Sequence, residues 1–388
     1  MTVVRQKRNF VVATLLRTTC DPFAQALQHA DRLRFYAVGT RRPTPGIAPE
    51  LTRLNPAIGL ANYLAARTLS NFRAESFRFR LHPWFDRWIK PQLQPGDHLL
   101  SAFGFVNESF KWVRAHGGRT FIDAGNSHPE SFWQIISEEH ARWGCDYPPI
   151  ARHQHERFLR MLPHVDYVLA PSEFVALSYA DRGFSPEQIL RNFYPLDLSC
   201  FAPSPEPRPK DRPLTLISTG SLSLRKGTPY LLEAFQMVCR EIPDARLLLT
   251  QMIADNVKPV LEKYRDLPIE WSPGLPHPQL AEHLRTADIF LLPSLEDGFA
   301  RTVTEALACG LPVITTPNTG ASDLITPGEN GEVVPIRDPR ALADAILAWS
   351  VRILRGDWQP RRLVDPILLS FEHFEKTFLA QLASRGLI

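Results

Sequence analysis

Two acidic residues, Asp297 and Glu305, flank a run in which backbone and side chains suit a ligand with a phosphate and hydroxyls. The N–H groups that would open a helix here have no partner within it, which favours an anion. They belong to Gly298, Phe299, Ala300 and Arg301. Carboxylates beside a phosphate are unfavourable unless they accept hydrogen bonds from neutral hydroxyls, such as those of a sugar or a ribose. A sugar nucleotide meets both demands. The alternative is that Asp297 caps the helix and Glu305 lies on a solvated face.

The residues around this run predict a strand, a tight turn, a helix and a second strand. LLPSL, residues 291–295, is an apolar strand, and RTVTEALACG is a helix that stops at Gly310. PVITT, residues 312–316, is the next buried strand, and residues 318–321 open a further loop. Two such β-α-β steps place both loops at the carboxyl edge of a parallel sheet, where open α/β folds bind ligands. Gly298 would let the backbone approach that ligand.

A second candidate segment is the basic loop between Gly220 and Gly227, which reads GSLSLRKG and precedes a helix predicted from Pro229. Adjacent Arg225 and Lys226 at a helix start are suited to a diphosphate, because the N–H groups and two cations share its charge. The alternative is a solvated basic turn.

A third candidate is the loop after a predicted strand that ends at Asp123. It delivers Asn126, Ser127 and His128, side chains that can hydrogen-bond to a sugar. The alternative is that His128 caps a helix or packs locally. His153 and His155 have no carboxylate partner in sequence, so we interpret them as part of a solvated helix rather than a metal site.

The run PSLEDGFARTVTEALACGLPVITTPNTGASDLI resembles the donor-binding segment of the family-4 glycosyltransferases of GT-B fold. That pattern has an acid, G-F-G, and a second glutamate before A-x-A-x-G-x-P-V-I. In this chain Asp297 replaces the usual Glu, and Ala300 replaces the last Gly. The resemblance implies that Asp297 contacts donor-sugar hydroxyls and that Glu305 holds the ribose.

Other segments carry the same resemblance. The family's G-R-L-x-x-x-K-G segment binds the donor diphosphate; Lys226 matches its Lys, Ser221 stands where Arg is usual, and Arg225 is the candidate to supply that charge. A subgroup carries G-S-S-H before a helix that ends E-E-x-A-R-W-G, which Ser127, His128 and residues 138–144 resemble, implying that His128 reaches the donor sugar. The loop at Leu275 matches the segment with which the family's proteins hold the nucleotide base of the donor. The implied catalytic residues are His128, Asp297 and Lys226; the implied donor-binding residues are Gly220, Ser221, Arg225, Lys226, Leu275, Asp297, Gly298, Phe299, Ala300, Arg301, Thr302 and Glu305; Asn126, Ser127 and His128 would lie on the sugar or acceptor side.

The 388 residues and 44% hydrophobic content predict two domains, each with its own core. Strands predicted at 9–16, 34–38, 98–105, 119–123 and 166–170 alternate with helices, which indicates a parallel sheet. Neither G-x-G-x-x-G nor a Walker loop is present, so a nicotinamide or ATP site is not expected. The expected fold class is α/β, GT-B, with two Rossmann-like domains facing across a cleft: an acceptor-side domain at 1–200 and a donor-binding domain at 201–369. An apolar face on the helix at 370–388 would pack back on the first domain.

Five scattered cysteines without a C-x-x-C pair argue against disulfides or a zinc site and favour a reduced cytoplasm. No stretch approaches twenty apolar residues, and the first residues are interpreted as a strand rather than a signal peptide. The sequence lacks the D-x-D triplet that the metal-dependent glycosyltransferase fold normally uses, so neither a metal nor a cofactor is expected beyond the nucleotide sugar itself.

Charge is concentrated near the start, where residues 1–90 hold fifteen Lys and Arg against five Asp and Glu. Between Asn71 and Lys90 arginines interleave with Phe and Trp, which suits peripheral contact with an anionic membrane or an acidic acceptor. The alternative is a helix that buries its aromatics. No RNA-binding motif accompanies the stretch, so nucleic acid is not an expected partner.

Together these features predict a retaining, hexosyltransferase-type enzyme. It would move a sugar from a nucleoside-diphosphate sugar to a glycan, lipid-linked or other acceptor in polysaccharide or glycoconjugate biosynthesis. The alternative functions are a catalytically degenerate sugar-nucleotide-binding protein and a membrane-surface assembly protein.

Overall fold

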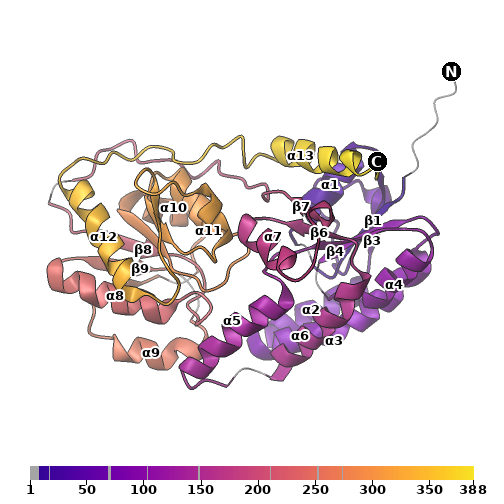
Figure 1. Ribbon diagram of the computed structural model, residues 1–388, viewed down its shortest axis with the longest axis horizontal. Helices are drawn as coiled ribbons and strands as arrows, with labels where there is room; N and C mark the ends of the chain where they lie inside the picture. The colour runs from indigo at the N-terminus through magenta and orange to yellow at the C-terminus, as the bar shows by residue number, and fades with distance from the viewer. Residues whose placement is uncertain are drawn as a thin grey trace.

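The chain forms two parallel β-sheets that lie side by side, each covered by helices (Figure 1). The structure is a computed structural model that describes residues 8–16, 18–68, 71–102, 104–146, 149–209, 211–250, 253–272 and 274–388. Phe103, within a predicted strand, lies outside these residues. Two doubly wound α/β sheets confirm the predicted fold class.

The first sheet has seven strands in the order β3-β2-β1-β4-β5-β6-β7, all parallel. Their bounds are β1 Phe10–Thr14, β2 Leu33–Val38, β3 Thr52–Leu54, β4 His98–Ala102, β5 Thr120–Asp123, β6 Tyr167–Ala170 and β7 Ile189–Arg191. Every residue of β1 is buried, because helices cover both faces of the sheet and apolar side chains on either face leave water. The chain order reverses beside β1 and β4, which places the crevice at their carboxyl ends.

The second sheet has six parallel strands in the order β10-β9-β8-β11-β12-β13. Their bounds are β8 Thr215–Ser218, β9 Arg246–Leu249, β10 Ile269–Trp271, β11 Ile289–Leu292, β12 Val313–Thr315 and β13 Gly331–Val333. The central strand β11 reads IFLL and is completely buried, as its continuous apolar run predicts.

Helices complete both layers. In the first half they are α1 Asp21–His29, α2 Pro56–Thr68, α3 Asn71–Ile89, α4 Asn107–Ala115, α5 Pro129–Arg142, α6 Pro149–Met161 and α7 Glu173–Ala180. In the second half they are α8 Thr228–Glu241, α9 Lys258–Lys263, α10 His277–Thr286, α11 Arg301–Ala308, α12 Pro339–Leu354 and α13 Phe371–Ser384.

The last helix, α13, crosses from the second half of the chain back to α1 (Figure 1). Phe374 and Phe378 each pack against Phe23 with ring centroids 4.9 Å apart, and Leu382 is also fully buried. Spacing these residues four positions apart places them on one stripe of the helix, which buries that stripe against the first sheet's helical layer.

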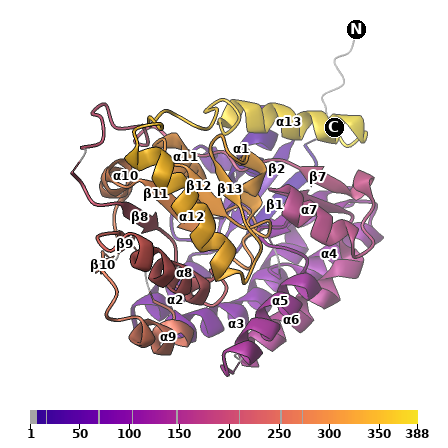
Figure 2. The same ribbon diagram turned by 60° about the vertical axis from the view of Figure 1, so that its left-hand side comes forward.

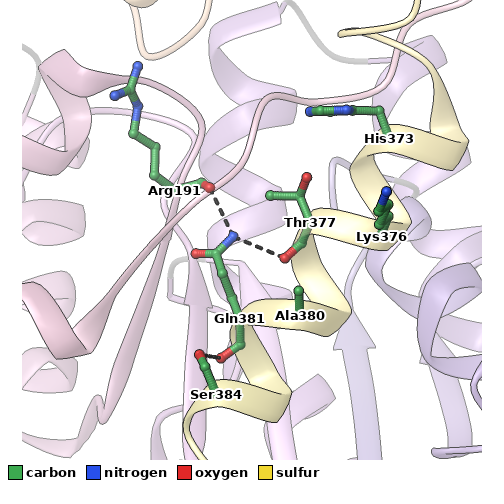
Figure 3. Close-up of a pocket in the computed structure, with 7 residues that line it drawn as sticks. All are labelled: Arg191, His373, Lys376, Thr377, Ala380, Gln381 and Ser384. Atoms are coloured by element: carbon green, nitrogen blue, oxygen red, sulfur yellow. Dashed lines mark hydrogen bonds between the residues drawn. The ribbon is translucent and has the colours of Figure 1, made fainter.

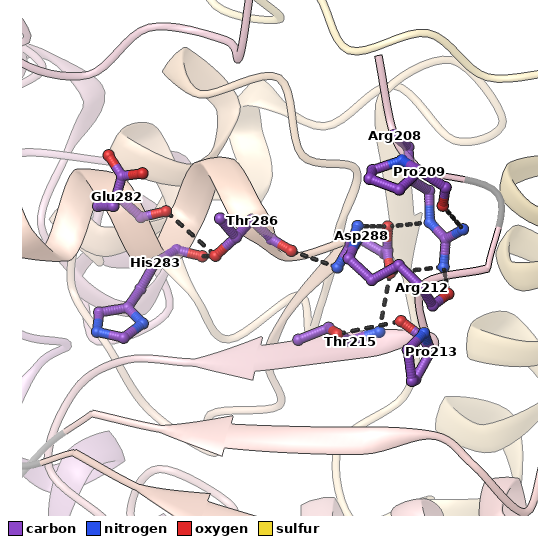
Figure 4. A network of polar contacts seen from close by, with 9 residues as sticks. All are labelled: Arg208, Pro209, Arg212, Pro213, Thr215, Glu282, His283, Thr286 and Asp288. Carbon is purple, nitrogen blue, oxygen red and sulfur yellow. Dashed lines mark hydrogen bonds and ion pairs between the residues drawn. The ribbon is translucent and has the colours of Figure 1, made fainter. Parts of the chain in front are cut away.

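A polar clamp holds the connection between the two sheets (Figure 4). The buried Asp288 carboxylate accepts hydrogen bonds from Arg208 Nε at 2.8 Å, from Arg212 at 2.5 Å and from the Thr215 backbone N–H at 2.8 Å. The proline- and charge-rich connection after residue 203 is therefore fixed at the entrance of β8 and β11.

The basic aromatic stretch is helix α3, with Pro83 inside it. Leu81, Phe85 and Ile89 are buried in the core, so much of the stretch is an ordinary packed helix. Trp84 is the exception, with 71% of its surface exposed. The side chains from Asn71 to Ser76 lie outside the described residues.

Candidate functional site

The predicted strand-turn-helix-strand unit is confirmed as β11, α11 and β12. The loop after β11 is tied to the loop after β12, because Asp297 N–H donates to Asn318 O at 2.9 Å and Gly320 N–H donates to Asp297 O at 2.8 Å. Both loops therefore lie at one carboxyl edge of the second sheet, as parallel strand order requires.

Asp297 forms an ion pair with Lys226 at this edge. The Lys226 ammonium donates to Asp297 Oδ2, and the side chains are only 13% and 14% exposed. Asp297 Oδ1 accepts the Ala300 N–H at 3.1 Å, so the carboxylate also occupies part of the helix start, as the capping alternative predicts. Burial alone would raise the pKa of Asp297, but the charges of Lys226 and Arg225 outweigh it and hold that pKa below its usual range.

Glu296 was not among the predicted site residues, and it connects the two halves of the chain. It is fully buried; Oε1 accepts hydrogen bonds from the backbone N–H of Ser127 at 2.9 Å and its hydroxyl at 3.1 Å. Oε2 pairs with Arg225 at 2.9 Å. The cation next to Lys226 and the hydroxyl of the first-domain loop are thus both engaged by Glu296. The only signal in the sequence is a second acid directly before Asp297.

Glu305 lies inside α11 and is 6% exposed, so the alternative of a solvated face is wrong. Burial raises the pKa of its carboxyl to about 7, opposed by the charge of Arg301. Within the described residues no hydrogen bond or ion pair engages this carboxyl, which leaves it available to a ligand.

Gly298 brings backbone to backbone across the two halves. A Cβ at Gly298 would lie 2.0 Å from Gly125 O, and a Cβ at Gly320 would lie 2.0 Å from Gly298 O. Ser172 Oγ also donates to Gly298 O at 2.7 Å. The space that we expected a ligand to approach is therefore filled by the Gly125 backbone in this closed arrangement.

Two neighbours of Gly298 serve the same junction. Phe299 is buried and packs against Phe193 and Tyr194, with ring centroids 5.7 and 5.6 Å apart. Ala300 adopts a left-handed backbone, with φ of 56°. A glycine has no Cβ to clash there, which explains why the family pattern has Gly at this position.

His128 ends the loop after β5 and caps α5. Its Nδ1 accepts the Glu130 N–H at 3.2 Å, its backbone N–H donates to Ser178 Oγ at 2.9 Å, and its ring meets Tyr179 edge-on at 5.1 Å. Burial lowers the pKa of His128 to about 4, so the ring is neutral with its proton on Nε2. The described residues form no hydrogen bond to Nε2.

The remaining predicted residues lie in different settings. Gly220 has φ of 114° and open space around it; Ser221 and Thr302 are half-buried; Arg301 and Asn126 are exposed; Leu275 packs partly against the core. His155 stacks on Trp133 at 4.7 Å between α6 and α5.

The predicted E-E-x-A-R-W-G element forms a second junction between the domains. Glu139 is fully buried and accepts hydrogen bonds from Trp143 Nε1, Tyr230 OH and Arg337 Nε, each at 2.8 Å. Arg337 also reaches the exposed Glu138 at 3.4 Å. Helix α5 is therefore attached to the second domain by a hub of four groups.

Residues 203–351 match the family model described as glycosyl transferases group 1. This match lies within the second sheet and its helices. The chain is 27% identical over 214 residues to the putative colanic acid biosynthesis glycosyltransferase WcaL of Escherichia coli, covering 52% of each chain. It is 27% identical over 258 residues to a GDP-mannose-dependent alpha-(1-6)-phosphatidylinositol monomannoside mannosyltransferase of Mycolicibacterium smegmatis, covering 60% of this chain and 62% of that one. The chain thus spans about half to three-fifths of the length of these relatives.

Solved structures extend the likeness to the whole fold. A sucrose-phosphate synthase of Thermosynechococcus elongatus superposes with a TM-score of 0.68 at 19% identity, covering 98% of this chain and 99% of that one. The lipopolysaccharide outer core galactosyltransferase WaaB superposes with a TM-score of 0.62 at 17% identity, covering 97% and 99%. At these identities the likeness shows the GT-B fold.

A hollow of about 520 Å³ lies between β7 and α13 (Figure 3). Arg191, His373, Lys376, Thr377, Ala380, Gln381 and Ser384 line it. None of them is a predicted donor-site residue.

Within the described ranges, no cluster of three or more His, Cys, Asp and Glu side chains has the arrangement of a metal site. None of the helices in those ranges is long and apolar enough to span a bilayer. All five cysteines are free thiols.

Proposed function

We propose that this protein is a retaining glycosyltransferase that moves a hexose from a nucleoside-diphosphate sugar to a glycan or lipid-linked acceptor. The observation that carries the proposal is the pairing of Lys226 with Asp297 at the carboxyl edge of the second sheet, next to the loop that ends at His128 and within the segment that matches the group 1 family model. The buried Glu305 follows on α11. The names of the relatives, which concern colanic acid and a phosphatidylinositol mannoside, support a role in polysaccharide or glycoconjugate biosynthesis.

Lys226 is the proposed ligand of the donor diphosphate. Its ammonium would exchange the Asp297 carboxylate for phosphate oxygens and stabilise the negative charge that develops on the leaving diphosphate. Preorganised cations of this kind contribute several kcal/mol to transition-state stabilisation, so the proposed reaction needs no metal. Arg225 would join Lys226 by leaving Glu296, and so supply the charge missing at Ser221.

Asp297, once released, would accept a hydrogen bond from a sugar hydroxyl, and Glu305 would bind the ribose. The unengaged Nε2–H of His128 would face the sugar from the first domain. Gly220, Ser221, Leu275 and Thr302 would complete the donor pocket. Because Gly125 and Gly298 are in contact, the two domains must separate before the donor enters. The retaining outcome rests on the family resemblance.

Peripheral contact with an anionic membrane at the cytoplasmic face is part of the proposal. Trp84 is 71% exposed on α3, and Arg80 and Arg87 are exposed on the same face of that helix. Helix α2 exposes Leu60, Tyr63 and Leu64, which also share a face. Aromatic and apolar side chains flanked by arginine suit the interface of an anionic bilayer.

The decisive test is thermal unfolding of the full chain with UDP, GDP, ADP and their sugar conjugates, without added metal. A ligand at a hundred times its dissociation constant stabilises by about 2.7 kcal/mol. We expect one base to stabilise the wild type and the exposed-lysine control Lys258→Ala, but neither Lys226→Ala nor Glu305→Ala. Binding without sugar transfer would favour the degenerate sugar-nucleotide-binding protein. No stabilisation by any nucleotide would overturn the donor site and favour an assembly protein.

A further inference from the structure

A fully buried carboxylate, that of Glu296, crosses the boundary between the two domains. Its Oε1 accepts the backbone N–H of Ser127 at 2.9 Å and the Ser127 hydroxyl at 3.1 Å, from the loop after β5. Its Oε2 accepts a hydrogen bond from Arg225 Nη1 at 2.9 Å, and the backbone O of Glu296 accepts another from the same nitrogen at 3.1 Å. Glu296 and Arg225 both belong to the second domain, so Ser127 is the group that the carboxylate holds across the boundary.

The loop that contains Ser127 lies directly on the proposed donor site. Gly125 O is so close to Gly298 that a Cβ at Gly298 would lie 2.0 Å from it. Gly298 is therefore covered by first-domain backbone at the point where we expect the donor to approach. Any contact that keeps this loop in place also keeps a ligand out.

The two hydrogen bonds from Ser127 are strong because their acceptor is charged and buried. A hydrogen bond to a charged group changes an equilibrium by roughly one to two powers of ten. Ser172 Oγ also crosses the boundary and donates to Gly298 O at 2.7 Å, but this carbonyl is neutral and the bond is correspondingly weaker. The Glu139 hub acts further along the chain, on α5. Glu296 is thus the charged group that fixes the Ser127 loop on the donor site.

Glu296 also engages one of the two cations proposed for the diphosphate. Arg225 pairs with Glu296 and the adjacent Lys226 pairs with Asp297, so two neighbouring cations are matched by two neighbouring acids. The side chain of Arg225 is 31% exposed, whereas that of Glu296 is completely buried. In the empty cleft the Glu296 carboxylate therefore offsets positive charge that would attract a diphosphate, while it holds the Ser127 loop over the site.

We propose that Glu296 is an autoinhibitory latch, which holds the empty cleft closed through Ser127 and must release it before a nucleotide enters. This inference rests on the proposed function, because it concerns the admission of the donor to that same site. Only molecules whose latch is open bind the nucleotide, so the apparent dissociation constant equals the intrinsic one divided by the open fraction. Weakening the latch should therefore tighten nucleotide binding, which is the reverse of what the loss of a ligand-binding residue does.

The first experiment titrates UDP, GDP and ADP into the full chain of the wild type and of Ser127→Ala by calorimetry. The alanine removes one hydrogen bond of the latch and leaves the charges around the diphosphate site unchanged. These nucleotides carry no sugar, so the proposed sugar contact of Ser127 does not enter the comparison. We expect the apparent dissociation constant of the nucleotide that binds to fall about tenfold. Ser137→Ala is the matched control, since its hydroxyl donates to Gln134 O within α5, and it should bind like the wild type.

Hydrogen exchange of the nucleotide-free protein measures the latch without a ligand. The backbone N–H of Ser127 donates to Glu296. The backbone N–H of Glu173 donates across the same boundary to Asp323 Oδ2 at 2.8 Å. Both amides lose their partner when the domains separate, so we expect both to exchange faster in Ser127→Ala, by the same factor as the fall in the dissociation constant. Faster exchange with an unchanged dissociation constant would show a purely structural contact and overturn the proposal.

Glu296→Gln is the second variant, which removes the charge of the latch and keeps its shape. It should accelerate the exchange of both amides and tighten nucleotide binding further, because it also removes a carboxylate that opposes the diphosphate. Thermal unfolding shows whether each variant is folded; if Glu296→Gln is not, Ser127→Ala decides.

The outcomes separate this inference from the proposed function. A nucleotide that binds the wild type as tightly as it binds folded Ser127→Ala and Glu296→Gln would overturn the latch and leave the transferase standing. If no form of the protein binds any of the three nucleotides, the proposed function fails. Faster exchange in both variants would then still support a latch on the cleft, and unchanged exchange would overturn it as well.

Discussion

The ammonium of Lys226 and the carboxylate of Asp297 neutralise each other in the ligand-free site, and both side chains are largely buried. Lys226, which we propose binds the diphosphate, and Asp297, which we propose binds the sugar, are therefore paired with each other until a donor binds. Donor binding must replace this contact with interactions of at least equal strength. The pair therefore favours ligands that carry both a phosphate and a hydroxyl group.

Removing both members of the pair is expected to destabilise the protein by less than the two single removals added together. Asp297→Asn or Lys226→Ala leaves a buried unpaired charge, which costs about 3–5 kcal/mol. The double variant Lys226→Met with Asp297→Asn should lose less than the sum of the single losses, measured by urea unfolding at pH 7. Additive losses would show that the two charges are not coupled.

The same pair predicts a pH dependence. The folded-state pKa of Asp297 is lowered, so its contribution to stability is complete above the unfolded-state value of about 3.9 and is lost as pH falls through the folded-state pKa. The stability difference between wild type and Asp297→Asn should thus narrow below about pH 4. Urea unfolding from pH 7 to pH 2.5 measures it.

Glu305 should act in the opposite direction. Its folded-state pKa is raised to about 7 by burial, so the folded state binds a proton that the unfolded state releases, and wild-type stability falls between about pH 4 and pH 7. Glu305→Gln should match the wild type at pH 4 and exceed it at pH 8 by on the order of 3 kcal/mol. The same variant should bind the donor nucleotide more weakly, because the ribose loses a charged acceptor. A pH-independent stability difference would contradict this assignment.

Ala300→Gly should stabilise the protein. A left-handed conformation costs a residue with a Cβ about 1–2 kcal/mol, and glycine avoids that cost while losing some chain entropy. We expect a net gain of about 1 kcal/mol in the free energy of unfolding. The control Ala306→Gly, inside α11, should instead lose about 1 kcal/mol or more.

Glu139→Gln should loosen the two domains. The carboxylate holds Trp143, Tyr230 and Arg337 together, and an amide leaves the Arg337 guanidinium short of its buried ion pair. We expect a lower unfolding midpoint and a larger radius of gyration in solution scattering. Glu138→Gln is the matched control, since Glu138 is half-exposed and more distant from Arg337, and it should change neither quantity.

Trp84→Ala should reduce binding to vesicles that contain phosphatidylglycerol, because it removes an exposed indole suited to the membrane interface. Co-sedimentation at low and high salt measures the effect, and raised salt should weaken wild-type binding. Leu177→Ala, which removes another exposed apolar side chain on α7, should leave sedimentation unchanged. Equal sedimentation of wild type and Trp84→Ala would remove α3 from the proposed membrane contact.

Local sequence patterns determined the elements and their order along the chain. The continuous apolar run of β11, the glycine turn and the periodic α11 each follow from neighbouring residues, whose burial and backbone preferences act over a few positions. The stripe on α13 likewise follows from the helical period of Phe374, Phe378 and Leu382. These patterns predicted two α/β sheets, and the family resemblance added the GT-B arrangement and the segments of the proposed site.

Only the tertiary structure decided which of those residues meet. Ser127 and Glu296 are 169 positions apart, and Gly125 approaches Gly298 because the loop after β5 meets the loop after β11. No local period encodes such a pairing. Packing within the second half of the chain placed Lys226 on Asp297 and left Glu305 without a partner among the described residues, since burial and charge depend on everything that surrounds a side chain. The sequence thus identified the candidate side chains of the site, and the tertiary packing determined which groups each one contacts and whether it is charged.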